Sequence, residues 1–266
     1  MNGRNRWLVV FVYALAMAWV EAAAVLYLRT LIGRVEPWQP NPLPVVGGLA
    51  AFELTREAAT LVMLMTVGIL AGGAWRSRLG YAAVAFGTWD IFYYVFLKAM
   101  CGWPRSLMDW DILFLIPLPW WGPVLAPVLI ALLLILWGTL ASQFEPARTH
   151  VLPKLAACAL GAAGAALALW LFMADEIAAA RQGEIAIRNV LPASFNWPLF
   201  CAALLLMAAP PLQLAWHSWP QARAKIQSIM SAGEVSCHCP SRRKPDETSG
   251  SGLEQQPPST QHPEIQ

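Results

Sequence analysis

Charged side chains are scarce in this sequence: 13% of its 266 residues are Asp, Glu, Lys or Arg, and 58% are hydrophobic. A soluble globular domain carries about 25% charged and about 45–50% apolar residues. The shortage of charge therefore excludes an ordinary soluble domain. The body of the chain belongs in a lipid bilayer, and lipid is its first expected partner.

Other absences narrow the classes of function. The net charge is only +2, which excludes a nucleic-acid binder that depends on bulk positive charge. The five cysteines are scattered, and none before residue 220 has the paired spacing of a disulfide framework. No known enzyme motif occurs. The composition thus indicates a membrane protein without identifying its activity.

Long apolar runs are what the sequence has in abundance. The hydrocarbon core of a bilayer is about 30 Å thick and needs about 20 apolar residues per helix. The segments that meet this length are Trp7 to Ile32, Ala50 to Trp75, Leu79 to Met100, Val124 to Phe144, Leu152 to Ala174 and Trp197 to Trp219. We therefore predict an all-α membrane protein with six transmembrane helices over residues 1–220. The first segment could instead be a cleaved signal peptide, but its apolar run continues to Leu28, beyond the about 7–15 residues of such a peptide.

The positions of Lys and Arg predict the orientation of the spans, because positive charge beside a span resists translocation. With the N-terminus inside, the cytoplasmic ends hold eight basic residues near the membrane against one acidic residue, Glu145. The opposite side holds six basic and six acidic residues. We expect a multi-pass protein of the plasma membrane with both termini in the cytoplasm.

Two segments outside the spans carry predictions of their own. Cys101 to Pro123 is rich in tryptophan, and Ser106 with Asp109 has the spacing of a capping box that opens a helix. We predict a short interfacial or re-entrant helix there, between the third and fourth spans, ending at Pro117. After Pro220, Ser, Pro, Gln and charged residues dominate, so residues 221–266 are predicted to form a disordered cytoplasmic tail.

Ionisable residues inside the spans are the candidate functional residues, because each costs about 2.5–3.5 kcal/mol at the bilayer centre. They are concentrated in the first three spans. Glu53, Arg56 and Glu57 lie at i, i+3 and i+4 and share one helical face. The candidates for binding an ion or a substrate are Glu21, Glu53, Arg56, Glu57, Asp90, Tyr94, Lys98 and Asp111.

These candidates predict a polar cavity that opens outward. Asp90, Tyr94 and Lys98 recur every four residues and form a stripe on the third span, which a short loop joins to the second. Within the spans, four carboxylates oppose only Arg56 and Lys98. Because uncompensated charge is not tolerated in a low dielectric, a proton or a small cation is expected to bind there. The alternative is that the charges pair only to hold the helices together.

No cofactor and no resident metal are expected. The four histidines, at positions 150, 217, 238 and 262, lie on the predicted cytoplasmic side or in the tail. The intramembrane cluster therefore offers only oxygen ligands, which suit Mg²⁺ or Ca²⁺ and not zinc, copper or haem iron. Cys237-His238-Cys239 resembles half of a zinc site, without the other half.

Three blocks carry a resemblance: Arg56-Glu57-Ala58, Phe86 to Tyr94 (FGTWDIFYY) and Trp110 to Trp120 (WDILFLIPLPW). They are similar to blocks in a group of multi-pass prokaryotic integral membrane proteins with no assigned function. The similarity covers about the first 145 residues. It implies a fold and a membrane location but no activity.

Three classes of function remain open. The leading one is movement or binding of a cation or proton by the carboxylate cluster, coupled to a small solute. The second is an intramembrane enzyme acting on a lipid or prenyl-type substrate, with Glu53, Glu57 or Asp90 as general acid or base. The third is a non-catalytic assembly subunit whose charges dock an unidentified protein partner.

Overall fold

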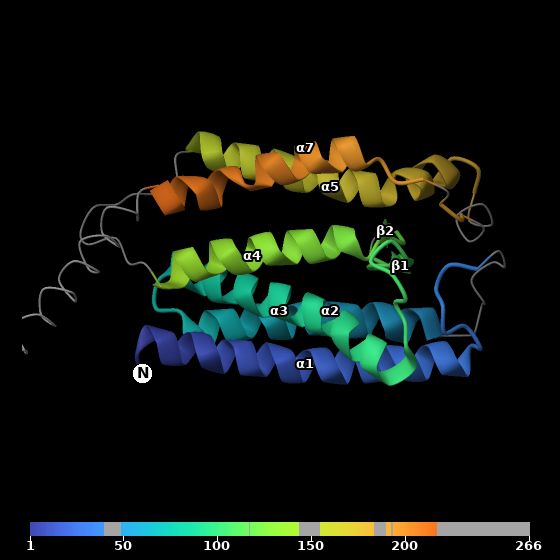
Figure 1. The fold of residues 1–266 in the computed structure, drawn as a ribbon, viewed down its shortest axis with the longest axis horizontal. Helices are drawn as coiled ribbons and strands as arrows, with labels where there is room; N and C mark the ends of the chain where they lie inside the picture. Colours follow the sequence, from blue (N-terminus) through green and yellow to red (C-terminus); the bar gives the residue numbers. More distant parts are fainter. Residues whose placement is uncertain (40–48, 117, 144–154, 184–189, 193, 217–266) are drawn as a thin grey trace, which may run out of the picture. The chain divides into compact units, whose positions relative to one another are not determined.

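The computed structural model describes residues 1–39, 49–116, 118–143, 155–183, 190–192 and 194–216. Its elements are α1 (Gly3–Leu31), α2 (Leu49–Ala71), α3 (Trp75–Cys101), β1 (Trp110–Ile112), β2 (Trp121–Pro123), α4 (Leu125–Gln143), α5 (Leu155–Ala180) and α7 (Trp197–Met207). The helices lie lengthwise beside one another, and the strands lie at the end away from the N-terminus (Figure 1).

Several helices are long and apolar enough to cross a membrane, which supports the predicted multi-pass class. The helices that meet both criteria are Gly3–Leu31, Ala51–Ala71, Leu125–Gln143, Leu155–Ala180 and Trp197–Trp216. The third predicted span corresponds to α3, which has 27 residues but carries charged residues at both ends and Asp90 within it. The described residues thus form a mostly helical protein with several membrane-length helices, and the count of six spans stays a prediction.

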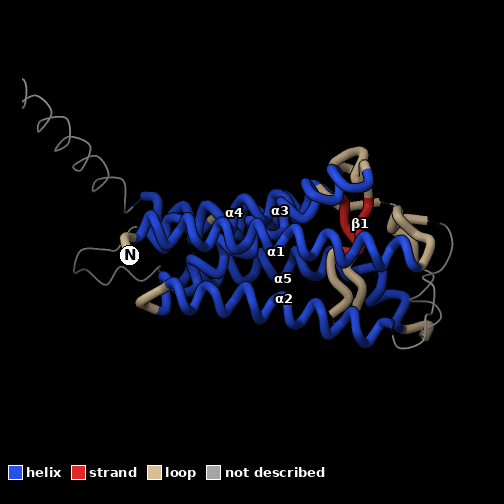
Figure 2. The backbone as a smooth tube through the Cα atoms, turned by 90° about the horizontal axis from the view of Figure 1, so that it is seen from below, coloured by secondary structure: helices blue, strands red, loops and turns tan. Residues whose placement is uncertain are grey.

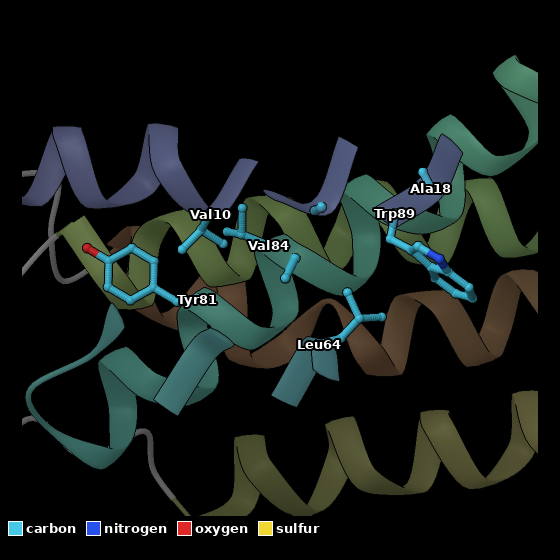
Figure 3. Packing of buried hydrophobic residues seen from close by; sticks show 8 residues of the cluster. Val10, Ala18, Leu64, Tyr81, Val84 and Trp89 are labelled. Atoms are coloured by element: carbon cyan, nitrogen blue, oxygen red, sulfur yellow. The ribbon is translucent and has the colours of Figure 1, made fainter. Parts of the chain in front are cut away.

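Helix α3 packs against α1, α2 and α4. Its first half meets α1 and α2 in an apolar cluster that includes Val10, Leu64, Tyr81, Val84 and Trp89 (Figure 3). The contact between α3 and α4 depends on glycine. A Cβ placed on Gly80 would lie 2.9 Å from the carbonyl oxygen of Gly138, so only residues without a side chain allow this approach.

Helices α5 and α7 pack on each other through small residues. A Cβ on Gly164 would lie 2.6 Å from the carbonyl oxygen of Ala203. Ala126 of α4, Phe172 of α5 and Phe200 of α7 belong to one buried cluster. The apolar contacts of this cluster therefore connect α4 to the α5–α7 pair.

The short helix predicted before Pro117 is wrong. Residues 102–109 form turns, and the chain then enters the antiparallel pair β1–β2, with Asp111 opposite Gly122 (Figure 2). The carboxylate of Asp109 accepts the backbone N–H groups of Arg105, at 2.7 Å, and Ser106, at 3.2 Å. The Asp109 carbonyl accepts the N–H of Val124 at 3.0 Å. The Ser106–Asp109 pattern therefore closes a turn that leads into a hairpin. No helix follows, because the Asp109 carbonyl accepts the N–H of Val124, which comes directly after β2.

One helix boundary differs from the prediction, and one predicted segment cannot be compared. Helix α5 continues to Ala180, whereas the fifth span was predicted to end at Ala174, so Asp175 and Glu176 are helical. The predicted tail, residues 221–266, and its Cys-His-Cys segment lie outside the described residues.

Candidate functional site

The candidate site begins on the buried face of α1. Along this face, small and apolar residues recur every three or four positions, as at Ala14, Ala18, Ala22 and Val25. The same stripe includes Glu21 and ends with Arg29, and both side chains are buried. The helical period that packs the apolar half of α1 therefore also directs two charged groups into the protein.

Arg29 forms an ion pair with Asp111 of the hairpin. The Nη2–Oδ1 distance is 2.7 Å, and both side chains are at least nine-tenths buried. The same nitrogen donates to the Tyr93 hydroxyl at 3.3 Å, and the guanidinium carbon lies 4.4 Å from the centre of the Trp103 ring. Charge pairing and a cation–π contact thus fix the hairpin against α1 and α3.

Asp111 is buried because side chains alternate along a strand. Its neighbours Trp110 and Ile112 are partly exposed, whereas Asp111 is completely inaccessible. Burial raises the pKa of the Asp111 carboxyl group, and the Arg29 guanidinium and the Ile112 N–H oppose this rise by stabilising the ionised form. The Tyr94 hydroxyl also interacts with this carboxylate.

A second ion-pair set joins α1 to α2. Arg56 contacts Glu21 across the helix interface and Glu53 on its own helix, where the Nε–Oε2 distance is 2.9 Å. The Thr60 hydroxyl donates to Glu21 at 3.1 Å. Arg56 and Thr60, which share one face of α2, therefore both contact Glu21 of α1.

Glu57 lies on the same face of α2 but forms no ion pair with Arg56. It contacts the hairpin. Both of its carboxylate oxygens accept the backbone N–H of Leu115, at 2.9 and 3.2 Å. Leu115 lies in the segment between β1 and β2. The hairpin is thus anchored on α1 through Asp111 and on α2 through Glu57.

Tyr93 of α3 stands between the two ion-pair sets. Its hydroxyl accepts from Arg29, and Asp111, Arg56 and Glu53 are all near enough to act on it electrostatically. The ionisable members of the resulting network are Glu21, Arg29, Glu53, Arg56, Glu57, Asp90 and Asp111. Five carboxyl groups therefore oppose two guanidinium groups.

Asp90 differs from the other four carboxyl groups. Its side chain is 8% exposed, and Asp111 is close enough to act on it electrostatically. Its Oδ2 atom has no hydrogen-bond partner among the residues that the structure describes, and neither has Oδ2 of Asp111, but the other oxygen of Asp111 is paired with Arg29. Glu21, Glu53, Glu57 and Asp111 each have a partner. Asp90 is therefore the member of the network with the least compensated charge.

The structure does not bring all of the predicted residues together. Lys98 is exposed and donates to the carbonyl of Gly102 at 3.2 Å, so it does not balance the carboxylates. Arg29 takes that role. The sequence analysis counted Arg29 only among the six basic residues of the outer side and did not single out Tyr93 or Trp103. The available signal was that Arg29 lies four residues after Val25 on the buried stripe of α1.

Comparisons with models of known protein families, with curated protein sequences and with solved structures find no match for this chain. Within the described ranges, no group of three or more His, Cys, Asp or Glu residues is arranged to hold a metal ion.

Proposed function

We propose that this chain is a multi-pass membrane protein in which Asp90, within the network around Arg29 and Arg56, takes up and releases a proton. The observation that carries the proposal is that the buried Asp90 carboxyl group takes part in no ion pair within the described chain and interacts electrostatically with a second buried carboxyl, Asp111, which Arg29 holds. Two buried carboxylates that interact in a low dielectric favour a state in which one holds a proton.

The distribution of partners supports Asp90 as the group that exchanges the proton. Asp111 is held by Arg29 and by a backbone N–H, and Glu57 is held by the backbone of the hairpin. Protonating either group would weaken the anchoring of the hairpin. Asp90 can gain or lose a proton without breaking any ion pair seen in the described chain.

A proton suits this site better than a metal ion. Hard cations require several oxygen ligands that converge at about 2.0–2.6 Å. Here the carboxylates are separated, because Arg56 occupies Glu21 and Glu53 while Leu115 occupies Glu57. A proton needs only one oxygen atom, and Asp90 offers one.

The larger proposal is proton-coupled movement of a small solute across the plasma membrane, with both termini cytoplasmic and the hairpin on the outer side. The positive charge near the predicted cytoplasmic ends supports this orientation. Intramembrane acidic residues that lack a fixed partner are typical of proton relays in transporters.

The test measures protonation directly. The purified protein is reconstituted in lipid nanodiscs, and infrared difference spectra are recorded between pH 5 and pH 9. Wild type is expected to show the carbonyl stretch of a protonated carboxyl group that appears as the pH falls. Asp90→Asn should fold with an unchanged melting temperature at pH 5 and lack this band, because the amide is nearly isosteric with the protonated acid.

The matched control is Glu36→Gln, which removes an exposed carboxylate paired with Arg105. It should keep the wild-type band and the wild-type dependence of melting temperature on pH. A wild-type melting temperature that is constant over this range and equals that of Asp90→Asn would contradict the proposal. The network would then serve only to hold the helices and the hairpin.

A further inference from the structure

A cavity of about 180 Å³ lies beside the hairpin, between α5 and the segment that leads into α7. Its lining residues are Trp110, Trp121, Trp170, Leu171, Phe172, Ala174, Asp175, Ser194, Phe195 and Asn196. An apolar protein cavity of about 150 Å³ holds a benzene molecule, which has six non-hydrogen atoms. A molecule of six to eight non-hydrogen atoms is the size of ligand that this cavity admits.

Half of the lining residues are aromatic. Phe195 stacks on Phe172 with 5.9 Å between ring centres and makes an edge contact with Trp110 at 6.2 Å. Trp121 is buried, whereas Trp170 is half exposed and stands at the edge of the protein. Rings from β1, β2, α5 and the segment before α7 thus surround one small space.

Asp175 is the one ionisable side chain among the described residues that line the cavity. Asp175 lines it, and in the described part of the chain Asp175 takes part in no ion pair. The next residue, Glu176, is not among the lining residues: it is completely buried, and neither of its carboxylate oxygens has a partner on another described residue. No Lys, Arg or His is among the described residues that line the space.

We infer that this cavity binds a small quaternary ammonium cation of the choline type. The faces of Trp and Phe rings attract such a cation, and its methyl groups fill an apolar space without requiring hydrogen bonds. Asp175 supplies the opposite charge at the rim. Ser194 and Asn196 supply polar atoms for a hydroxyl or ester group attached to the cation.

This site is separate from Asp90 and does not depend on the proposed proton exchange. Trp110 lines the cavity, whereas the next residue of β1, Asp111, pairs with Arg29 in the ion-pair network. Successive side chains of a strand point to opposite faces, so Trp110 and Asp111 are directed to different surroundings.

The same headgroup chemistry has two sources, a free ammonium compound and a phosphatidylcholine headgroup. Both can reach the cavity, because Asp175, Ser194 and Trp170 are exposed. The experiment therefore uses nanodiscs of two compositions, phosphatidylglycerol alone and phosphatidylglycerol mixed with phosphatidylcholine.

Binding of radiolabelled choline to the full chain is measured by scintillation proximity. In phosphatidylglycerol nanodiscs we expect saturable binding that tetramethylammonium displaces. The uncharged isostere 3,3-dimethylbutan-1-ol should displace choline at least tenfold less well, because it has the same shape without the charge. Phosphatidylcholine in the nanodisc should weaken choline binding if the lipid headgroup is the occupant and leave it unchanged if the free compound is.

Two variants test the named residues. Asp175→Asn and Trp170→Leu should each weaken choline binding at least fivefold while keeping the wild-type melting temperature, since both side chains are exposed. Glu36→Gln and Trp75→Leu, which change exposed residues outside the cavity, should bind as wild type does. The inference is overturned by the absence of saturable binding in phosphatidylglycerol nanodiscs, by equal potency of the uncharged isostere, or by unchanged affinity in a folded Asp175→Asn variant.

Discussion

The two ends of the α1–α2–α3 bundle differ in chemistry although the same helices build both. Toward the N-terminus of α1, Val10, Leu64 and Val84 pack in a cluster without charge. Toward the hairpin, Glu21 and Arg56 take the corresponding positions between α1 and α2. Apolar packing suffices to hold helices together, and a buried ion pair often adds no net stability over it. The buried charges are therefore better explained by the anchoring of the hairpin and by the proposed proton exchange at Asp90 than by a need to hold the helices together.

The largest effect should come from leaving a charge unpaired at the charged end. Asp111→Asn removes the partner of Arg29, whose guanidinium stays buried and cannot neutralise. We expect a loss of about 3–5 kcal/mol in the free energy of unfolding, measured in mixed detergent micelles. The double variant Arg29→Leu/Asp111→Asn should be more stable than the single one, because no unpaired charge remains. A less stable double variant would show that Arg29 acts through contacts other than the ion pair.

The sequence predicted the helices better than it predicted the site. Apolar runs located every described membrane-length helix to within about six residues at each end, because the bilayer imposes a strong length requirement. The hairpin was missed because Ser106 and Asp109 give the same local signal in a helix cap and in a turn. Only the pairing of Trp110–Ile112 with Trp121–Pro123 distinguishes the two, and that contact is not local.

The network itself was half predictable. Glu53, Arg56 and Glu57 were found as one face because helical spacing is local. Their partners on other elements were not, since Glu57 contacts the backbone of Leu115, 58 residues away in sequence. Glu176 went unrecognised as a buried group because the fifth span was predicted to end two residues before it.

Removing the two carboxylates that pair with Arg56 should differ in its pH dependence from removing Arg56 itself. Glu21→Gln/Glu53→Gln leaves the partly buried guanidinium without an ion-pair partner, and we expect a loss of about 2–3 kcal/mol that does not change between pH 5 and pH 8. Arg56→Leu leaves two carboxyl groups that can neutralise by taking up protons. Its loss should therefore shrink as the pH falls, in the same micelle assay. Identical pH profiles for the two variants would contradict this asymmetry.

The apolar end can be damaged alone. Gly138→Ala places a methyl group against the backbone of Gly80 and Val84, and we expect a loss of about 2 kcal/mol from overpacking. Gly73→Ala is the control, because no heavy atom lies within 4 Å of the added Cβ. Gly138→Ala should keep the wild-type shape of the melting-temperature profile between pH 5 and pH 9, since Asp90 and its neighbours are unchanged. A changed shape would show that the two ends are not independent.

The smallest effect should come from an ion pair of the same chemistry that is not buried. Arg105 and Glu36 are in contact, but their side chains are 77% and 45% exposed, against 10% and 1% for Arg29 and Asp111. Water screens an exposed pair and already solvates each partner, so its coupling energy should be at most about 0.5 kcal/mol. A double-mutant cycle with Arg105→Ala and Glu36→Ala measures this coupling, and high salt should abolish it. The cycle for Arg29 and Asp111 should give a coupling several times larger that salt leaves nearly unchanged, because burial excludes the screening ions. Similar couplings for the two pairs would mean that burial does not set the energetics of the charged end.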